Sequence, residues 1–331
     1  MEFRQFRYIL TTAREGTISK AAQKLYISQP SLSQLIAGVE KKIGAPLFDR
    51  SVTPLRPTAV GSLYLETARR ILDLDEEFQQ RTDDMLKRSA GRVTVGSSPF
   101  RSTYLLSRFL PGFQRDYPQI QVRLRESTTR QLEALAQDGS VDIVLSLAPI
   151  DLKQFTAEEL FQEELLLALP PDHPLSVHYG LPDRLTSSLP VLPLAALRDT
   201  PFIRLHPEQK IHDHMMMLCA KAGFTPQIKL ETRSLEAAQS LAGAGLGATL
   251  LPDTIIAGFR PAQTPRYAAI DSHPHRRVLI AWRHSRYLSQ AARAFIRSLR
   301  TFCSRPGPDG TQPDTQAPKE SETYSTPFGI G

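Results

Sequence analysis

Hydroxyl and amide side chains are concentrated in one short stretch, residues 28–34, which reads Ser-Gln-Pro-Ser-Leu-Ser-Gln. These groups donate and accept hydrogen bonds, and in the major groove of DNA a Gln or Ser side chain can contact the edges of base pairs. The side chains that helical spacing turns outward are Gln29, Ser31, Ser33 and Gln34. Their chemistry suits contact with a nucleic acid, provided that a helix presents them.

Two short helices around a tight corner are expected to position this stretch. The first helix has small apolar residues at helical spacing: Ile18, Ala21, Ala22 and Leu25. Ser28 is a good N-cap for the second helix, and Pro30 is tolerated in its first turn, where amides lack helical partners. The second helix buries the residues Leu32, Leu35, Ile36 and Val39, and Gly44 ends it. The pattern predicts a helix-turn-helix, whose second helix can enter a major groove with its N-terminus.

A helical hairpin in the core of another kind of protein would show similar spacing. The distribution of charge favours a polyanionic partner instead. Residues 1–70 contain eleven Lys and Arg against five Asp and Glu, whereas residues 71–331 contain 29 of each. The whole formal excess of +6 therefore lies in the first fifth of the chain, as expected for a DNA-binding unit.

A long helix is expected over residues 58–88, because Thr58 is a suitable N-cap and the segment contains no Pro. Residues alternately four and three apart form a mostly apolar stripe: Val60, Tyr64, Thr67, Ile71, Leu74, Phe78, Arg81 and Met85. Such a seam suits the pairing of two helices, so we predict a dimerisation helix of about 45 Å that also links two domains. The residues assigned to pairing are Val60, Tyr64, Ile71, Leu74 and Phe78. Packing of this stripe on the helix's own domain is the alternative.

Short strands alternate with helices after residue 91. Apolar alternation or short apolar runs predict strands near residues 92–96, 119–125, 141–145, 165–169, 202–203, 227–231, 248–251 and 278–282. Helical spacing lies between them and again in residues 289–302. This order implies an α/β fold with a parallel sheet and buried crossovers.

The N-terminal pattern resembles that of the LysR-type transcriptional regulators. The residues that match in order and spacing are Ala21, Ala22, Leu25, Ser28, Gln29, Pro30, Ser33, Ile36, Glu40, Gly44, Pro46, Leu47, Phe48, Arg50, Thr58 and Gly61. Chain length and later organisation extend the resemblance to roughly residues 1–303. It implies a winged helix-turn-helix with residues 47–57 as the wing, a linker helix, and a two-lobed effector domain similar to periplasmic binding proteins.

The resemblance assigns roles to individual residues of the N-terminal unit. Gln29, Pro30 and Ser33 would contact base edges, while Ser28 and basic side chains would contact phosphates. Arg50 would lie along the wing. The complete set of expected DNA-binding residues is Ser28, Gln29, Pro30, Ser31, Ser33, Gln34 and Arg50.

Three features depart from the usual pattern of this family. No Lys or Arg lies between Ser28 and Glu40, and Thr53 stands where the wing usually carries a second basic residue. Gly38, in the middle of the second helix, costs about 1 kcal/mol relative to Ala. Fewer phosphate contacts imply weaker DNA binding with a shallower dependence on salt.

The expected domains follow from these boundaries. Residues 1–57 would form the DNA-binding unit, residues 58–88 the linker helix, and residues 89–303 the effector domain. Within the last, lobe I would comprise about residues 91–155 and 267–303, and lobe II about residues 156–266. Residues 304–331 are rich in Pro, Gly, Ser and Thr and are expected to be a disordered tail.

Candidate effector-binding residues lie near the expected carboxyl ends of strands, where ligands of such folds bind. The first lobe offers the hydroxyl residues Ser97, Ser98, Thr128 and Thr129, and the second lobe offers Phe202, Arg204 and Gly247. Hydroxyls and helix-start amides can hold an anion such as a carboxylate. The alternatives are that each Ser or Thr is only an N-cap and that Arg204 forms a surface ion pair.

Residues for catalysis or metal binding are not arranged in a recognisable site. His212 and His214 are two apart on an expected helix, where they do not share a face, and residues 273–277 lack a Cys or carboxylate at metal-ligand spacing. Cys219 and Cys303 fit small core positions. The charged N-terminus is unlike a signal peptide, and no apolar run approaches the length of a membrane span, so a cytoplasmic protein without cofactor or metal is expected.

The sequence thus predicts a DNA-binding regulator that responds to a small polar or acidic metabolite and acts as a homodimer or homotetramer. The resemblance implies activation of genes near its own, repression of its own promoter, and contact with RNA polymerase. The alternative is a small-molecule-binding protein or enzyme in which the N-terminal unit mainly mediates assembly. Salt-dependent, sequence-selective binding to double-stranded DNA distinguishes the first from the second.

Overall fold

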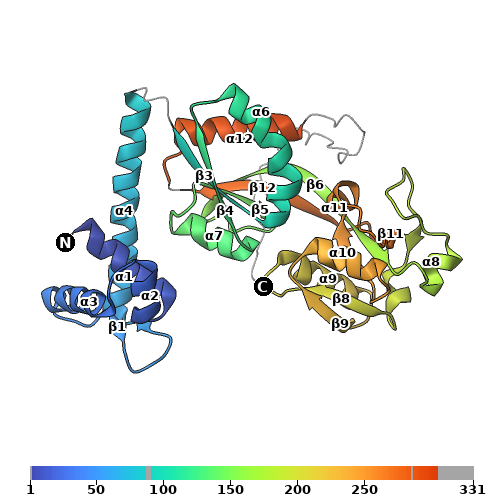
Figure 1. Ribbon diagram of the computed structural model, residues 1–331, viewed down its shortest axis with the longest axis horizontal. Helices are drawn as coiled ribbons and strands as arrows, with labels where there is room; N and C mark the ends of the chain where they lie inside the picture. Colours follow the sequence, from blue (N-terminus) through green and yellow to red (C-terminus); the bar gives the residue numbers. More distant parts are fainter. Residues whose placement is uncertain (1, 87–90, 285, 305–331) are drawn as a thin grey trace, which may run out of the picture.

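The computed structural model describes residues 2–86, 91–284 and 286–304, so the expected end of the linker helix and the tail after residue 304 lie outside it. The N-terminal unit consists of α1 Phe3–Glu15, α2 Ile18–Lys24, α3 Gln29–Ile43, β1 Phe48–Asp49 and β2 Arg56–Pro57. The long helix α4 Ala59–Met85 leads from this unit to the rest of the molecule (Figure 1). The helix-turn-helix, the wing and the linker helix therefore form where the sequence predicts them.

Small and apolar side chains hold the N-terminal helices together. Ala21 and Ala22 are buried in α2, and their short side chains allow α3 to pack closely through Leu32 and Ile36. The α2–α3 corner turns at Tyr26, whose φ of 55° lies in the left-handed region. This packing leaves the opposite side of α3 free.

The first turns of α4 belong to the same core. Leu65 and Ala68 are buried, and the ring of Tyr64 lies 5.8 Å from the ring of Phe6 in α1. Tyr64 is only 8% exposed, so it packs within its own chain and is not available for the dimerisation seam where the sequence placed it. A boundary at residue 57 also separates α4 from a core that it helps to build. The misassignment arose because a core face and a pairing face have the same helical period.

Lobe I of the effector domain is a sheet covered by helices on both faces. Its elements are β3 Arg92–Ser97, α5 Pro99–Arg101, the π-helix η1 Ser102–Leu106, α6 Ser107–Asp116, β4 Gln121–Glu126, α7 Thr129–Gln137, β5 Ile143–Leu147, the first part of β6 Phe155–Leu169, β12 His275–Arg283 and α12 Gln290–Cys303. Figure 1 shows α6 and α12 above this sheet and α7 below it.

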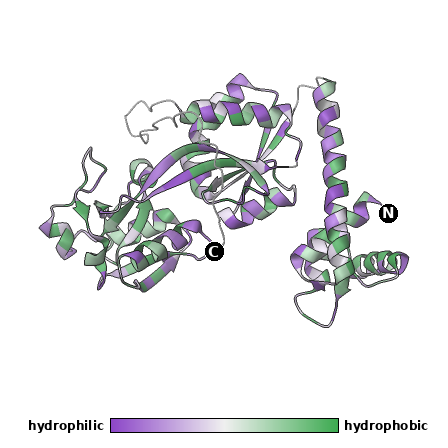
Figure 2. Ribbon diagram, turned by 180° about the vertical axis from the view of Figure 1, so that it is seen from behind, coloured by the Kyte–Doolittle hydropathy of each residue, from purple (hydrophilic) through white to green (hydrophobic). Residues whose placement is uncertain are grey.

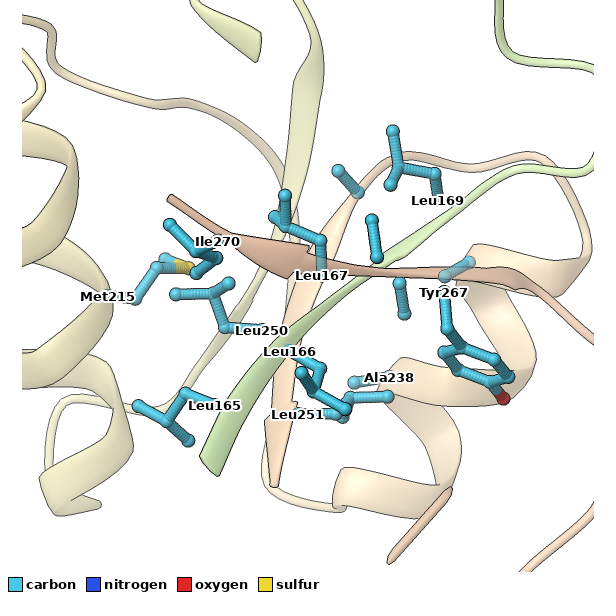
Figure 3. Packing of buried hydrophobic residues seen from close by; sticks show 14 of the residues in the cluster. Leu165, Leu166, Leu167, Leu169, Met215, Ala238, Leu250, Leu251, Tyr267 and Ile270 are labelled. Carbon is cyan, nitrogen blue, oxygen red and sulfur yellow. The ribbon is translucent and has the colours of Figure 1, made fainter. Parts of the chain in front are cut away.

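Lobe II is built around the second part of β6. Its further elements are α8 Pro174–His178, β7 Val191–Leu192, the 3-10 helix η2 Leu194–Leu197, β8 Pro201–Leu205, α9 Lys210–Lys221, β9 Gln227–Thr232, α10 Leu235–Gly243, β10 Thr249–Pro252, α11 Asp253–Gly258 and β11 Arg266–Ile270. Leu165, Leu166 and Leu167 of β6 pack against Leu250, Leu251 and Ile270 in a fully buried apolar core (Figure 3). This core gives lobe II a stable frame from which loops extend toward lobe I.

The sheet is mixed, which corrects the expectation of a parallel sheet. β3 pairs in parallel with β4 and β5, but β12 is antiparallel to both β5 and β6. β6 is also antiparallel to β10 and β11. The reason is that β6 carries the chain out of lobe I and β12 carries it back, so the two connecting strands run in opposite directions.

The pairing of β6 also moves the lobe boundaries. Residues 155–164 pair with β12 in lobe I, whereas residues 165–169 pair with β10 and β11 in lobe II. The chain therefore changes lobe near residue 164 and returns between β11 and β12, in residues 271–274. The boundaries expected at residues 156 and 267 fall inside β6 and β11, because a continuous strand across both lobes has no turn signal to mark the crossing.

Candidate DNA interface and ligand cleft

The N-terminal half of α3 presents a polar, uncovered face. Ser28 caps the helix, since its Oγ accepts a hydrogen bond from the amide of Ser31 at 3.3 Å. The exposed residues at this end are Gln29, Pro30, Ser31 and Gln34, while Ser33 is half-buried. Gln29 is oriented by α2, because its Oε1 accepts a hydrogen bond from the Ser19 hydroxyl at 3.0 Å. The Gln29 amide nitrogen remains a donor for another partner.

Glu40 fixes the root of the wing to α3. One carboxylate oxygen accepts a hydrogen bond from the Leu47 amide at 2.8 Å, and the other accepts one from Arg50 Nη2 at 2.9 Å. The expected position of Arg50 along the wing is thus defined by an ion pair within the unit. The short β1–β2 ladder follows directly, so the wing is attached to the C-terminal part of α3.

Tyr26 belongs to the same surface, although the sequence assigned it only to the corner. Its side chain is 95% exposed and it lies two residues before the N-cap of α3. A large aromatic side chain that no core covers, beside a helix N-terminus, is a candidate contact residue. The signal in the sequence was weak, because an aromatic residue between two helices more often packs inward.

A cavity of about 440 Å³ lies between the two lobes. It is lined from lobe I by Ser98, Pro99, Phe100, Arg101, Glu126, Ser127, Thr128, Thr129, Gln131, Leu145, Ser146, Leu147 and Arg276, and from lobe II by Gln209, Lys210, Ile211, Arg233, Ser234, Leu235 and Glu236. The structure therefore brings together Ser98, Thr128 and Thr129 of the expected set. Ser97 is fully buried beneath them and does not line the cavity. Ser98 and Thr128 are also N-caps, so both interpretations of these hydroxyls apply.

The three residues expected from lobe II do not reach this cavity. Phe202 is fully buried in the lobe II core, and Arg204 forms an ion pair with Glu231 at 2.5 Å. Gly247 packs against the backbone of Pro201. The error has a physical cause: β8 continues to Leu205, so these residues lie within or beside the strand and short of its carboxyl end.

Residues beyond the carboxyl ends of β8 and β9 line the cavity instead. Gln209 and Lys210 follow β8, and Arg233 and Ser234 follow β9. The sequence contained a usable signal here, since Ser234 caps α10 directly after an alternating strand. The polar residues that follow each strand, and not those within it, form the lobe II side of the cleft.

Two buried arginines border the cavity from below. Arg101 donates through both Nη atoms to Glu163, Arg276 Nε lies 2.8 Å from the same carboxylate, and all three side chains are nearly inaccessible to solvent. Burial alone would raise the pKa of Glu163, but the attraction of Arg101 and Arg276 outweighs it and holds the pKa at about 2. Two guanidinium groups therefore share this carboxylate at the edge of the cleft.

Contacts between the lobes define their relative position. Lys210 Nζ of lobe II donates to Glu133 Oε1 and to the carbonyl oxygens of Leu147 and Pro149, each at 2.7 Å. Tyr104 of η1 also packs so closely on α11 that a Cβ at Gly258 would lie 2.6 Å from its ring. The lobes are thus joined at two separate contacts.

The described residues contain no cluster suited to a metal ion, and both cysteines are buried. No group of three or more His, Cys, Asp or Glu side chains there is arranged to hold a metal ion. Burial raises the pKa of the Cys219 thiol to about 11 and that of Cys303 to about 12, which agrees with their expected place in the core. None of the described helices is both long and apolar enough to cross a membrane.

Residues 87–304 match the family model of the LysR substrate binding domain, and residues 3–62 match that of the bacterial regulatory helix-turn-helix protein, lysR family. The chain belongs to the LysR family. Curated relatives include the uncharacterized HTH-type transcriptional regulator YwbI of Bacillus subtilis (strain 168), 30% identical over 93% of this chain and 99% of that protein. A probable RuBisCO transcriptional regulator of Porphyra purpurea is 31% identical over 94% of this chain and 96% of its own.

Solved structures of this family share the fold. Full-length OxyR from Pseudomonas aeruginosa matches with a TM-score of 0.64 and 23% identity, covering 92% of this chain and 94% of that one. The chain is thus a LysR-type transcriptional regulator, with a helix-turn-helix unit and an effector-binding domain, and not an enzyme. Regulators of this family bind DNA and small-molecule effectors, so the α3 surface and the inter-lobe cavity are the two places to examine.

Proposed function

We propose that this protein binds operator DNA through the exposed N-terminal half of α3 and through the wing, as a homodimer or homotetramer in the cytoplasm. The observation that carries the proposal is the uncovered polar face at Gln29, Ser31 and Gln34 on a helix that is otherwise packed against its own unit. CbnR, solved in complex with its target DNA, matches this chain with a TM-score of 0.59 and 24% identity, covering 91% of this chain and 99% of that one. This match supports the docking of α3 in a major groove.

The expected roles of individual residues follow from the family resemblance. Gln29, Pro30 and Ser33 would contact base edges from a frame that Ser19 and the helix core hold in place. Ser28, basic side chains and the amides at the start of α3 would approach phosphates, where the helix dipole favours negative charge. Because Arg50 is already paired with Glu40, the wing would add one partly neutralised cation, together with the exposed Arg56 of β2, to the interface.

Dimerisation would use the apolar residues of α4 that the chain itself leaves uncovered. Leu74 and Phe78 are 66% and 69% exposed, and Val60 is 38% exposed. Ile71 lies at the edge of the N-terminal core. A second copy of α4 would cover these side chains and place two α3 helices on one dyad-symmetric site.

The effector would be a small polar or acidic metabolite in the inter-lobe cavity. Hydroxyls of Ser98, Thr128 and Thr129 lie on one side and Lys210 with Arg233 on the other. An anionic group would be favoured by these cations and by the amides at the start of α7. By the family resemblance, binding would activate genes near its own, with RNA polymerase as a further partner, and the free protein would repress its own promoter.

Fluorescence-anisotropy titration with the chain's own upstream intergenic DNA tests the DNA-binding proposal. We expect a preference over scrambled DNA of roughly a thousandfold and a weakening of affinity with salt. Gln29→Ala should reduce this preference by about tenfold, in line with the loss of one base contact, whereas Gln121→Ala in the exposed strand β4 should not. Equal, weak binding to both DNAs would contradict the proposal.

A further inference from the structure

Helix α7 lines the ligand cleft at one end and is linked to the linker helix through two arginines at the other. Its first residues, Thr129 and Gln131, line the cavity together with the N-cap Thr128. The helix has nine residues, so its C-terminal end lies about 14 Å away. The two ends therefore lie in different surroundings, and each is held by specific polar contacts.

Lobe II holds the N-terminal half of α7 through two ion pairs. Lys210 Nζ lies 2.7 Å from Glu133 Oε1, and Arg130 Nη2 lies 2.6 Å from Asp213 Oδ2. Lys210 and Asp213 both belong to α9. A change in the position of lobe II relative to lobe I must therefore displace α7 or break these contacts. An anionic ligand in the cavity would compete with Glu133 for Lys210.

Arg283, the last residue of β12, and Arg286, three residues after it, bind backbone carbonyls at the C-terminal end of α7. Arg283 Nη1 donates to the carbonyl oxygen of Gln137, the last residue of α7, at 3.0 Å, and Arg286 Nη1 donates to that of Gly139, two residues further on, at 2.5 Å. Carbonyls at the end of a helix lack helical partners and attract cations. Arg286 is only 8% exposed in its side chain.

The same arginines bind the linker helix. Arg283 Nη1 lies 2.7 Å from Asp73 Oδ2, and Arg286 Nη2 lies 2.8 Å from Glu76 Oε2. Tyr287 adds a hydrogen bond to Asp84 at 2.9 Å. We refer to Arg283 and Arg286, with Asp73 and Glu76, as the linker latch. The latch joins α4 and the end of α7 through shared side chains.

The contact between α4 and lobe I is polar in character. Hydrophilic residues predominate along the part of α4 that leaves the helix-turn-helix unit (Figure 2). Among the described residues, the hydrophobic clusters of lobe I contain no side chain of α4. Polar contacts of this kind gain less from burial than an apolar core and can exchange partners, so this junction is suited to more than one arrangement.

We propose that α7 and the linker latch couple the inter-lobe cleft to the DNA-binding unit, which rests on the proposed role of that cleft as the effector site. A shift of α9 on effector binding moves α7, and the movement of α7 alters the ion pairs that Arg283 and Arg286 form with α4. The angle of α4 determines where α3 is placed on DNA. Reciprocally, DNA that favours one angle of α4 favours one state of the cleft.

A double-mutant cycle tests this coupling without knowledge of the effector. Lys210→Met disturbs the cleft, and Arg283→Met with Arg286→Met removes the latch. With the latch intact, we expect Lys210→Met to change the affinity for the upstream DNA by roughly fivefold or more. Without the latch, we expect the same substitution to change the affinity by less than about twofold. Equal changes in both backgrounds, or no change in either, would overturn the proposal.

Control variants distinguish this coupling from a general effect of losing an ion pair and from impaired folding. Arg300→Met removes an exposed lobe I ion pair with Glu158 and should leave the effect of Lys210→Met intact. Asp213→Asn, which removes the ion pair with Arg130, provides a second disturbance of the contact between α9 and α7 should Lys210→Met impair folding. Amide hydrogen exchange of residues 72–85 reports on the linker helix without DNA, and it should rise severalfold in Lys210→Met only when the latch is present. A wild-type protein that does not prefer its upstream DNA would count against the proposed function, whereas the exchange experiment would still decide the coupling.

Discussion

Asp253 and Glu163 are neighbouring carboxylates with opposite behaviour. Glu163 forms ion pairs with two arginines and accepts a hydrogen bond from the Thr254 hydroxyl at 2.6 Å, and it stays ionised. Asp253 begins α11 beside this cluster. Burial raises the pKa of Asp253 to about 6, and the charge of Glu163 adds to the effect. At neutral pH, Asp253 is thus held ionised in surroundings that disfavour its charge.

Asp253→Asn should stabilise the protein in a pH-dependent manner. The folded pKa of Asp253 lies above the unfolded one, so stability falls as pH rises from about 4 to about 6, and the full cost is present above pH 6. We expect the substitution to raise the free energy of unfolding by up to about 2 to 3 kcal/mol at pH 8, with little gain at about pH 3, below both pKa values. Urea unfolding at a series of pH values measures this difference. A gain of equal size at every pH would show that the carboxylate charge is not its cause.

Gly61 and Gly38, two glycines in helices of the N-terminal unit, differ in the space that a larger side chain would have. A Cβ at Gly61, in the first turn of α4, would lie 1.9 Å from the carbonyl oxygen of Leu47 at the start of the wing. The amide of Thr58 donates to the same oxygen at 3.0 Å, so the backbone of the wing is held against α4. Gly38, in the middle of α3, has nothing within 4 Å of such a Cβ.

Substitution of these glycines by alanine should have opposite effects. Gly61→Ala must push α4 away from the wing and should destabilise the unit by about 1 to 3 kcal/mol. Gly38→Ala should stabilise it by about 1 kcal/mol, because it gains helix propensity without steric conflict. Thermal unfolding followed by circular dichroism compares the two proteins. Destabilisation by Gly38→Ala would mean that the exposed face of α3 is not free.

Elements with strong local signals could be predicted from the sequence, and their relations in space could not. The helix-turn-helix followed from Ser28, Pro30 and Gly44, because caps and helix ends act within a few residues. The place of Tyr64 in the N-terminal core and the antiparallel direction of β12 depend on partners far away in the chain. No local pattern records them.

The candidate cleft was only half predictable for a related reason. Thr128 was found because a threonine after an alternating strand marks a helix start at a strand end. Arg204 was misplaced because the apolar pair at residues 202–203 marks only part of the strand, which extends to residue 205. An error of two residues in the position of the strand end moves a side chain from the sheet into the cleft. Strand ends are the least certain boundaries of a sequence interpretation and also the places where ligands bind.

At the scale of the whole molecule, α4 turns different faces to different partners. Asp73 and Glu76 contact lobe I, while Leu74 and Phe78 remain exposed. Large exposed apolar side chains on one helix indicate a surface that a partner covers. The proposed partner is α4 of a second copy, and two linked helix-turn-helix units would then bind one operator together.

Replacement of Leu74 and Phe78 by Glu should separate the copies, because paired helices would bring the added charges together in an apolar seam. We expect sedimentation velocity to show a shift toward the monomer and the affinity for upstream DNA to fall by roughly a hundredfold, as two linked sites become independent. Val177→Glu, at a lobe II position that is 70% exposed, provides the matched control and should change neither property. A double variant that sediments like the wild type would exclude α4 as the main dimer contact. In that case the effector domains must hold the copies together, and the two α3 helices would be spaced by those domains and not by α4.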